Sequence, residues 1–339
     1  MQIQENISLK PYNTFGINAA ARYFSKFTSL SELDELFHFG SLNKKIPTLV
    51  LGGGSNILLT QDYRGLVVIN EMQGIEVVNQ DAQHVYLRAA AGENWHRFVL
   101  YCIENNLAGI ENLSLIWGSV GASPMQNIGA YGVEAKDVFY QLEAYNIKEK
   151  RVQVFSAKDC EFGYRESIFK RKYKGQFVIT SVTYKLNKQP VFNTSYGAIQ
   201  QELDKMGVQE LSIAAISQAV INIRQNKLPD PKEAGNAGSF FKNPTIPKQQ
   251  FEKLQTKFPA IVGYPAKDNT VKVAAGWLIE QCGWKGYKKG DAGCHAKQAL
   301  VLVNYGKANG VDIYNLSTKI VHSVVAKFGI ILEREVNVI

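Results

Sequence analysis

The sequence predicts an α+β protein, because segments with strand periodicity and segments with helix periodicity alternate along the chain and no internal repeat is present. Its 339 residues exceed the usual size of one hydrophobic core, which predicts two or three domains. A hydrophobic fraction of 45% and a charged fraction of 20% are typical of globular proteins. No apolar stretch approaches the roughly 20 residues that span a bilayer, and no signal pattern opens the chain, so we expect a cytoplasmic protein without membrane contact.

The first half of the chain alternates short strands with two helices. Apolar or alternating residues predict strands at 48–51, 57–59, 66–69 and 84–89. Helical spacing predicts helices at 31–37, after a serine N-cap, and at 94–104. The second helix would place Trp95 and Cys102 on one apolar face, so we expect Trp95 and its neighbour His96 to be packing residues.

The second half has the same mixed character. Its predicted strands are 141–146, 152–155, 177–184, 299–304 and 330–336, and its predicted helices are 212–223, 271–279 and 311–328. Two prolines make 227–231 a predicted rigid linker. Two glycines within four residues predict a flexible break at 235–238.

Two glycine-rich loops indicate where a ligand binds. The first is Gly52, Gly53, Gly54, Ser55 and Asn56, and the second runs from Gly118 to Gly132. Glycine allows a positive φ and leaves no Cβ, so a phosphate can approach several backbone N–H groups at once. The loops lack the Walker and Rossmann patterns. We therefore predict a cradle for the pyrophosphate of a dinucleotide cofactor, while a tight turn or a demanding close packing would also use glycine.

The formal charge of +8 does not by itself indicate a nucleic-acid partner, because lysines and arginines are spread along the chain. The one dense run, 170–174, is compatible with a solvated loop, a phosphate-steering patch or an RNA contact. The four cysteines, at 102, 160, 282 and 294, have neither a pairing rhythm nor a CxxC motif. We expect reduced thiols and no metal site.

Six blocks carry a resemblance to a known family: LKPYNTFG at 9–16, GENWH at 92–96, QNIGAYG at 126–132, FGYRESIFK at 162–170, NAGSFFKNP at 236–244 and LEREV at 332–336. In this order they resemble the bacterial UDP-N-acetylenolpyruvoylglucosamine reductases, flavoenzymes that complete the synthesis of UDP-N-acetylmuramic acid for peptidoglycan. The resemblance covers nearly the whole chain and fits the longer branch of the family, which has a mobile tyrosine loop.

The resemblance implies both the fold and the domain boundaries. It implies an FAD-binding scaffold of two subdomains, similar to vanillyl-alcohol oxidase and PCMH, followed by an α+β substrate-binding domain. The expected boundaries are 1–70 plus 329–339 for subdomain 1, 71–213 for subdomain 2 and 214–328 for the substrate-binding domain. The C-terminal strand would thus return to the first subdomain.

The implied activity is that of a UDP-N-acetylmuramate dehydrogenase. NADPH reduces FAD, and the flavin then reduces UDP-N-acetylglucosamine enolpyruvate. Arg165 would stabilise the substrate carboxylate and the enolate that develops from it, and Ser239 would protonate the adjacent carbon. Glu335 matches the third catalytic residue of the family.

The resemblance also implies the binding residues. The cofactor residues are Gly52, Gly53, Gly54, Ser55, Asn56, Gly118, Ser119, Gly121, Ala122, Ser123, Gln126, Asn127, Gly129, Ala130, Tyr131 and Gly132. The substrate residues are Tyr196, Arg224, Lys227, Asn243 and Tyr264. The expected partners are these small molecules alone, with no nucleic acid, and the expected state is a monomer.

Three features depart from the family pattern. Trp117 and Arg334 stand where proline is common, and the chain stops four residues after Glu335. Two alternatives of other classes stay open on the sequence. An FAD-dependent oxidase on the same scaffold is one, and a non-enzymatic nucleotide-binding or RNA-binding protein is the other.

Overall fold

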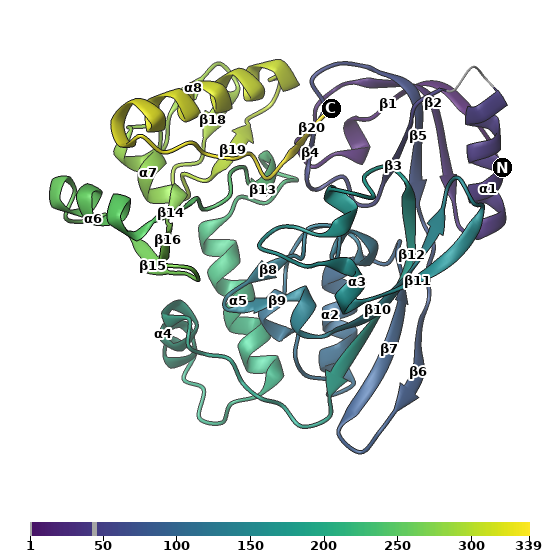
Figure 1. Ribbon diagram of the computed structural model, residues 1–339, viewed down its shortest axis with the longest axis horizontal. Coiled ribbons are helices and arrows are strands. Elements are labelled where there is room, and N and C mark those ends of the chain that lie inside the picture. Colours follow the sequence, from purple (N-terminus) through teal and green to yellow (C-terminus); the bar gives the residue numbers. More distant parts are fainter. Residues whose placement is uncertain (1, 43–45) are drawn as a thin grey trace. The chain divides into compact units, whose positions relative to one another are not determined.

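The computed structural model of this chain describes residues 2–42 and 46–339, and Figure 1 shows the order of their helices and strands. They form two compact units, each assembled from several stretches of sequence. Unit 1 comprises residues 1–7, 21–53 and 64–226, and unit 2 comprises residues 8–20, 54–63 and 227–339. Within the described ranges, no helix has the length and apolar character required to cross a membrane.

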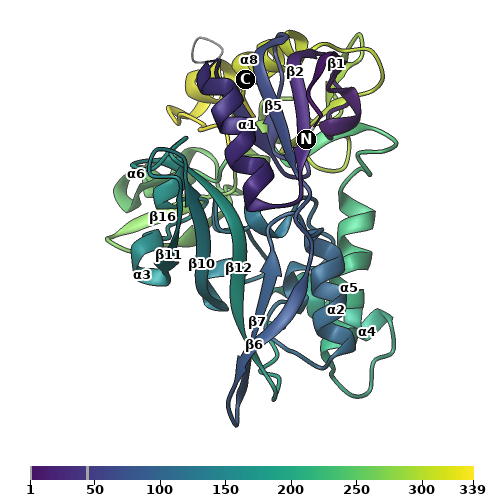
Figure 2. The same cartoon turned by 90° about the vertical axis from the view of Figure 1, so that its right-hand side faces the viewer.

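The first sheet of unit 1 has the order β1-β2-β5-β3. Its strands are β1 (Gln4–Ser8), β2 (Ala20–Phe27), β3 (Thr48–Leu51) and β5 (Tyr63–Asn70), and its helix is α1 (Leu30–Leu42). Leu33 and Leu36 of α1 are fully buried against Phe27 and Leu66 of the sheet, where Figure 2 shows α1 covering one face. Strand β3 pairs in parallel with β5, and the chain continues from the end of β3 directly into the first glycine-rich loop.

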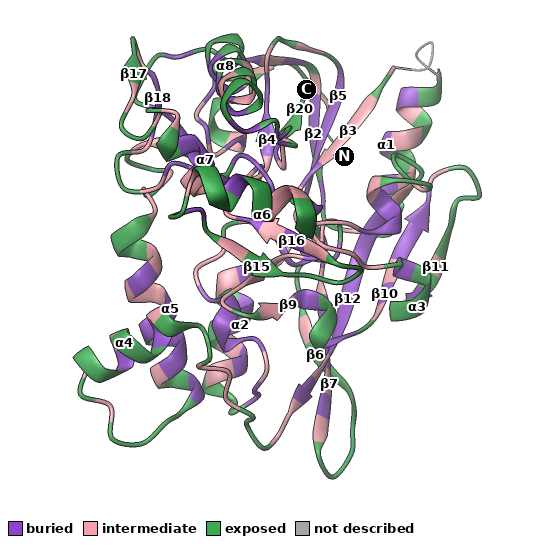
Figure 3. Cartoon of the chain, turned by 60° about the vertical axis from the view of Figure 1, so that its left-hand side comes forward, coloured by how far each residue is buried: buried purple, intermediate pink, exposed green. Residues whose placement is uncertain are grey.

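A five-stranded antiparallel sheet, in the order β11-β10-β12-β7-β6, carries the second core of unit 1. Its strands are β6 (Ile75–Gln80), β7 (His84–Ala90), β10 (Phe139–Asn146), β11 (Arg151–Ser156) and β12 (Phe177–Asn187). Most residues of β10 and β12 are buried, and both strands are largely purple in Figure 3. Helix α2 (Trp95–Glu104), capped by Asn94, buries Trp95 and Phe98 beside Tyr184 of β12.

The remaining elements of unit 1 carry the loops around the predicted site. They are the hairpin β8 (Gly129–Ala130) and β9 (Val133–Glu134), the short helix α3 (Ala157–Cys160), and helices α4 (Gly197–Lys205) and α5 (Ile213–Lys227). Buried aliphatic residues of α4 and α5, including Ile199, Leu203 and Ile216, form a small core of their own. Tyr131, at the end of the second glycine-rich loop, packs against that core.

Unit 2 contains two antiparallel sheets, in the orders β13-β19-β18-β17 and β14-β16-β15. Their strands are β13 (Gly235–Ser239), β14 (Thr245–Pro247), β15 (Gly263–Pro265), β16 (Thr270–Val273), β17 (Lys288–Lys289), β18 (Ala292–Cys294) and β19 (Val301–Asn304). The helices are α6 (Lys248–Lys257), α7 (Ala275–Gln281) and α8 (Gly310–Phe328). Helix α8 is capped by Asn309 and ends at Gly329, and Figure 1 shows it beside β18 and β19.

The chain end returns to an early segment of the sequence. Strand β20 (Asn337–Val338) pairs in parallel with β4 (Ile57–Leu58), and Thr60 N–H donates to the Ile339 carbonyl at 2.7 Å. The pairing joins two segments of unit 2, and the expected return of the C-terminal segment to subdomain 1 remains a prediction. The three-domain boundaries expected from the resemblance remain a prediction.

Three local predictions are wrong. The predicted flexible break at 235–238 is strand β13, which pairs with β19. The predicted helix at 271–279 is the end of strand β16 followed by α7, which begins at Ala275. The predicted last strand at 330–336 is an extended segment with a single bridge, between Phe241 and Arg334, and only 337–338 form a regular strand.

Candidate active site

The two predicted glycine-rich loops interlock in unit 1. A Cβ on Gly52 would overlap the Ser119 hydroxyl, and a Cβ on Gly53 would lie 3.0 Å from the Gly118 Cα. Real Cβ atoms essentially never come as close to another atom as at Gly52, and the distance at Gly53 is tighter than nine in ten real Cβ contacts, so close packing favours glycine at both positions. The close packing that the sequence left open therefore explains these two glycines.

The interlocked loops still fit a phosphate-containing cofactor. Within the described part of the chain, the backbone N–H groups of Gly52, Gly53, Gly118 and Ser119 have no protein acceptor. Neighbouring N–H donors on tight turns form the kind of concave site that binds phosphate oxygens. The residues present are therefore suited to holding the pyrophosphate of FAD.

Two polar side chains of the second loop hold the loop itself. Asn127 is fully buried and has a φ of +46°. Its amide donates to the Glu134 carboxylate and the Gly163 carbonyl at 3.0 Å each, and it accepts from Lys136 N–H. Ser123 is buried in a 2.7 Å hydrogen bond with the Tyr184 hydroxyl. The other predicted cofactor residues of this loop, Gly121, Ala122, Gln126, Gly129, Ala130, Tyr131 and Gly132, are half-buried or exposed.

Arg165 lies at the tip of a tight turn. The Gly163 N–H donates to the Glu166 carbonyl at 3.0 Å, which closes the turn around Tyr164 and Arg165. Arg165 has a φ of +54°, a region that favours glycine or asparagine. Its guanidinium donates to the Gly129 carbonyl at 2.5 Å and lies 5.2 Å from the centroid of the Tyr164 ring. The predicted catalytic arginine is thus held against the predicted cofactor loop.

Arg224, Tyr131 and Tyr196 form a second cluster in unit 1. Tyr131 and Tyr196 pack edge to face with ring centroids 5.5 Å apart, and the Arg224 guanidinium interacts electrostatically with the Tyr131 hydroxyl. The Arg224 Nε also donates to the Leu115 carbonyl at 3.1 Å. Burial lowers the pKa of Arg224 and raises the pKa of Tyr131. A half-buried cation beside an exposed tyrosine is suited to an anionic ligand.

Asn112, the residue that joins this cluster together, was not among the residues predicted from the sequence. Asn112 is 1% exposed, and its amide donates to the Tyr131 carbonyl at 3.0 Å and to the Asn193 carbonyl at 2.9 Å. One side chain thereby ties the second glycine-rich loop to the segment that leads into Tyr196. Asn112 lies between Glu111 and Leu113, which are also buried, and sequence alone names no partner for it.

Ser239 and Glu335 lie on neighbouring backbone segments of unit 2. Ser239 is an exposed residue at the end of β13, directly after Gly238, which has a φ of +68° at a break in the β13–β19 register. Glu335 N–H donates to the Phe240 carbonyl at 2.8 Å. Ser239 therefore directly precedes the residue that pairs with Glu335.

Further contacts fix the Glu335 segment. The Asn56 amide donates to the Glu335 carbonyl at 3.3 Å, and Asn337 N–H donates to the Asn56 carbonyl at 3.1 Å. Lys242, three residues after Ser239 in the sequence, is buried, and its Nζ forms an ion pair with Glu333 at 2.5 Å. The first glycine-rich loop thus continues into a contact with the predicted catalytic glutamate.

The other predicted residues of unit 2 have separate positions. The Asn243 side chain accepts from Ala275 N–H at 2.9 Å at the start of α7. Tyr264 is 54% exposed on β15, and Lys227 is exposed at the end of α5. Gly54 has a φ of +57° and packs so closely on the Tyr12 carbonyl that no Cβ would fit, and Ser55 is half-buried.

A separate cavity of about 390 Å³ lies between β17 and α8 and is lined by Lys289, Asp291, Lys307 and Lys319 among others. None of the predicted site residues lines it. Residues 2–42 and 46–339 contain no group of three or more histidine, cysteine or acidic side chains arranged to hold a metal ion.

Comparison with known proteins identifies the family. Residues 25–153 match the FAD binding domain family, and residues 230–339 match the family described as UDP-N-acetylenolpyruvoylglucosamine reductase, C-terminal domain. The UDP-N-acetylenolpyruvoylglucosamine reductase of Flavobacterium johnsoniae is 52% identical over 100% of both chains. The chain belongs to this reductase family. The reductase of Amoebophilus asiaticus is 51% identical, also over 100% of both chains.

The fold of this family member matches a solved reductase. The crystal structure of UDP-N-acetylenolpyruvylglucosamine reductase from Thermus caldophilus aligns with a TM-score of 0.70 at 23% identity, covering 100% of this chain and 99% of that chain. The α+β fold with an FAD-binding scaffold is therefore confirmed, as is FAD as the cofactor.

Proposed function

We propose that this chain is a flavin-dependent oxidoreductase that reduces the enolpyruvyl group of UDP-N-acetylglucosamine enolpyruvate with NADPH, giving UDP-N-acetylmuramate for peptidoglycan. When bound, FAD supplies the redox chemistry, accepting hydride from NADPH and passing it to the vinyl carbon. The protein must bind the substrate carboxylate, stabilise the charge that develops on it, and supply one proton to the neighbouring carbon.

The observation that carries the assignment of residues is the pairing of Glu335 with Phe240, directly after Ser239. It supports Ser239 as the proton donor and Glu335 as a second polar residue on the neighbouring backbone segment. A serine hydroxyl is a weak acid, so it needs a neighbour that can stabilise its conjugate base or replace its proton. Arg165, permanently charged and held by the Gly129 carbonyl, is the proposed partner of the carboxylate and enolate.

The substrate's diphosphate and uridine need cationic and aromatic contacts. We assign these contacts to Arg224 and Tyr196 from the cluster of unit 1, with Lys227, Asn243 and Tyr264 as further contacts. The buried amide of Asn112 supports this assignment, because it orders the segments that carry Tyr131 and Tyr196. We further propose that the enzyme works as a monomer in the cytoplasm and binds no nucleic acid, which light scattering and RNA binding at low salt would test.

An anaerobic visible spectrum tests the proposed activity. NADPH should bleach the flavin band, and UDP-N-acetylglucosamine enolpyruvate should restore it. Ser239→Ala should leave the NADPH step largely intact and slow the substrate step by several orders of magnitude, while the surface variant Ser41→Ala should match the wild type. Equal loss in both steps would reject Ser239 as proton donor. Flavin that recovers only with oxygen would instead indicate an oxidase.

A further inference from the structure

The backbone of residues 333–337 is held on two sides. On one side, Lys242 N–H donates to the Glu333 carbonyl at 2.9 Å and Glu335 N–H donates to the Phe240 carbonyl at 2.8 Å. On the other side, the Asn56 amide donates to the Glu335 carbonyl, and both the backbone N–H and the side-chain amide of Asn337 donate to the Asn56 carbonyl. The backbone around Glu335, between the bridge at Arg334 and strand β20, is therefore fixed by hydrogen bonds to two neighbouring segments.

Arg334 adds an anchor through its side chain. Its Nε donates to the Ser317 hydroxyl and its second nitrogen donates to the Thr318 hydroxyl, both at 2.8 Å. The guanidinium also lies 4.7 Å from the centroid of the Tyr314 ring. Ser317 and Thr318 lie three and four residues after Tyr314 on α8, so the three partners lie on one face of a single rigid helix. A planar guanidinium holds its N–H donors in a fixed arrangement, so it loses little side-chain entropy for each hydrogen bond that it makes to this face.

The direction of Arg334 sets the direction of its neighbours. In an extended segment, successive side chains point to opposite sides. Arg334 contacts α8, so Glu333 and Glu335 face the other way, and the 2.5 Å ion pair between Glu333 and Lys242 agrees with this alternation. Rotation of the segment about its own axis would break all three contacts of Arg334 with α8.

We propose that Arg334 is a positioning residue that fixes the direction in which the Glu335 side chain leaves the segment. The inference rests on the catalytic role proposed for Glu335. Arg334 N–H donates to no backbone carbonyl within the described part of the chain, because the flanking bonds use the Glu333 carbonyl and the Glu335 N–H. Proline at this position would therefore restrict the backbone without removing a hydrogen bond of the pairing with 240–242.

The test compares Arg334→Met, Arg334→Lys and Arg334→Pro by rapid-mixing kinetics and hydrogen exchange. Arg334→Met should leave flavin reduction by NADPH unchanged, slow flavin reoxidation by the substrate about tenfold or more with kcat falling more than KM rises, and speed amide exchange at Glu335. Arg334→Lys should be intermediate, and Arg334→Pro should recover most of the rate. Arg22→Met, which removes a similar contact over Tyr23, should match the wild type.

Glu335→Gln separates this inference from the proposed function. If Glu335→Gln leaves reoxidation unchanged, the role of Glu335 and the inference are both overturned. If Glu335→Gln slows reoxidation but Arg334→Met changes neither reoxidation nor exchange at Glu335, only the inference is overturned. The inference would also be overturned if Arg334→Met slowed flavin reduction and flavin reoxidation equally, because equal slowing indicates a general loss of structure.

Discussion

Arg165 has a left-handed backbone conformation that residues with a Cβ disfavour. A residue with a side chain pays about 1 kcal/mol or more to hold a left-handed φ, which glycine avoids and asparagine tolerates. The turn keeps an arginine at +54° and directs its guanidinium to the Gly129 carbonyl. Strain of this kind is retained where a side chain is needed for function.

The strain at Arg165 can be measured apart from its chemistry by comparing Arg165→Ala with Arg165→Asn. Both variants lose the guanidinium contacts, so both should slow substrate reduction strongly. Arg165→Asn should nevertheless be more stable to denaturant than Arg165→Ala by about 1 kcal/mol, because asparagine tolerates the left-handed conformation. Equal stabilities, or a more stable alanine variant, would show that the turn changes its backbone when the arginine is removed.

At the scale of elements, the two glycine-rich loops depend on each other. Gly52→Ala should separate them and weaken FAD binding, because the new Cβ would overlap the Ser119 hydroxyl. Most of that obstacle is a side chain, so adding Ser119→Gly should restore much of the affinity. Gly54→Ala should have no such remedy, because its obstacle is the Tyr12 backbone and its φ is +57°. Fluorescence titration of the apoprotein with FAD would measure each affinity, and failure of the double variant to recover would contradict the interlocking.

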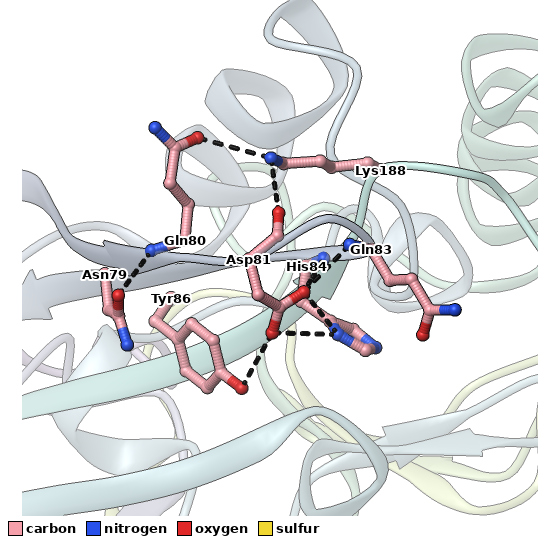
Figure 4. Close-up of polar contacts among 7 residues, drawn as sticks. All are labelled: Asn79, Gln80, Asp81, Gln83, His84, Tyr86 and Lys188. Carbon is pink, nitrogen blue, oxygen red and sulfur yellow. Dashed lines mark hydrogen bonds and ion pairs between the residues drawn. The ribbon is translucent and has the colours of Figure 1, made fainter.

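The turn between β6 and β7 is stabilised by one carboxylate, as Figure 4 shows. Asp81 accepts from Gln83 N–H and His84 N–H at 2.8 Å, which lowers its pKa to about 2 from 3.8. Because the folded pKa is the lower one, the carboxylate stabilises the turn above pH 3.8, and this contribution is lost as the pH falls toward 2.

The amide signals of Gln83 and His84 should therefore titrate with a midpoint near pH 2 in nuclear magnetic resonance spectra. Asp81→Asn keeps an oxygen acceptor and removes the charge, so the same signals should not titrate in that variant. A midpoint near 3.8 in the wild type would mean that the two hydrogen bonds do not favour the charged carboxylate.

The long helices and the strands with apolar or alternating residues were predictable from the sequence, whereas two segments whose conformation depends on an irregular partner were not. Helices α2 and α8 lie within one residue of their predicted ranges, because each has a strong apolar face and an asparagine cap. Strand β13 contains two glycines and has little intrinsic strand preference, and its pairing with β19 decides its conformation. The segment 330–336 has the strand composition but lacks a continuous partner.

The candidate site divides in the same way. Motif order identified the family and the named residues, and glycine content identified both loops. Asn112 contacts residues 19 and 81 positions away in the sequence, and Arg334 contacts residues 16 and 17 positions away. No local sequence pattern predicts contacts over such separations. Lys242 is a further example, because its ion pair with Glu333 joins residues 91 positions apart in the sequence.

At the scale of the whole molecule, the cofactor should contribute to stability as well as chemistry. A ligand that binds only the folded state stabilises it by about 2.7 kcal/mol when its concentration is 100 times its dissociation constant. Gly52, Gly53, Gly118 and Ser119 belong to unit 1, so calorimetry should show that FAD raises the unfolding temperature of this unit by several degrees. Gly52→Ala at the same FAD concentration should show a smaller rise, and Gly52→Ala with Ser119→Gly a rise closer to that of the wild type. Wild-type protein that binds FAD without any rise would mean that the unfolded chain binds the cofactor equally well, which a site built from two interlocked loops does not allow.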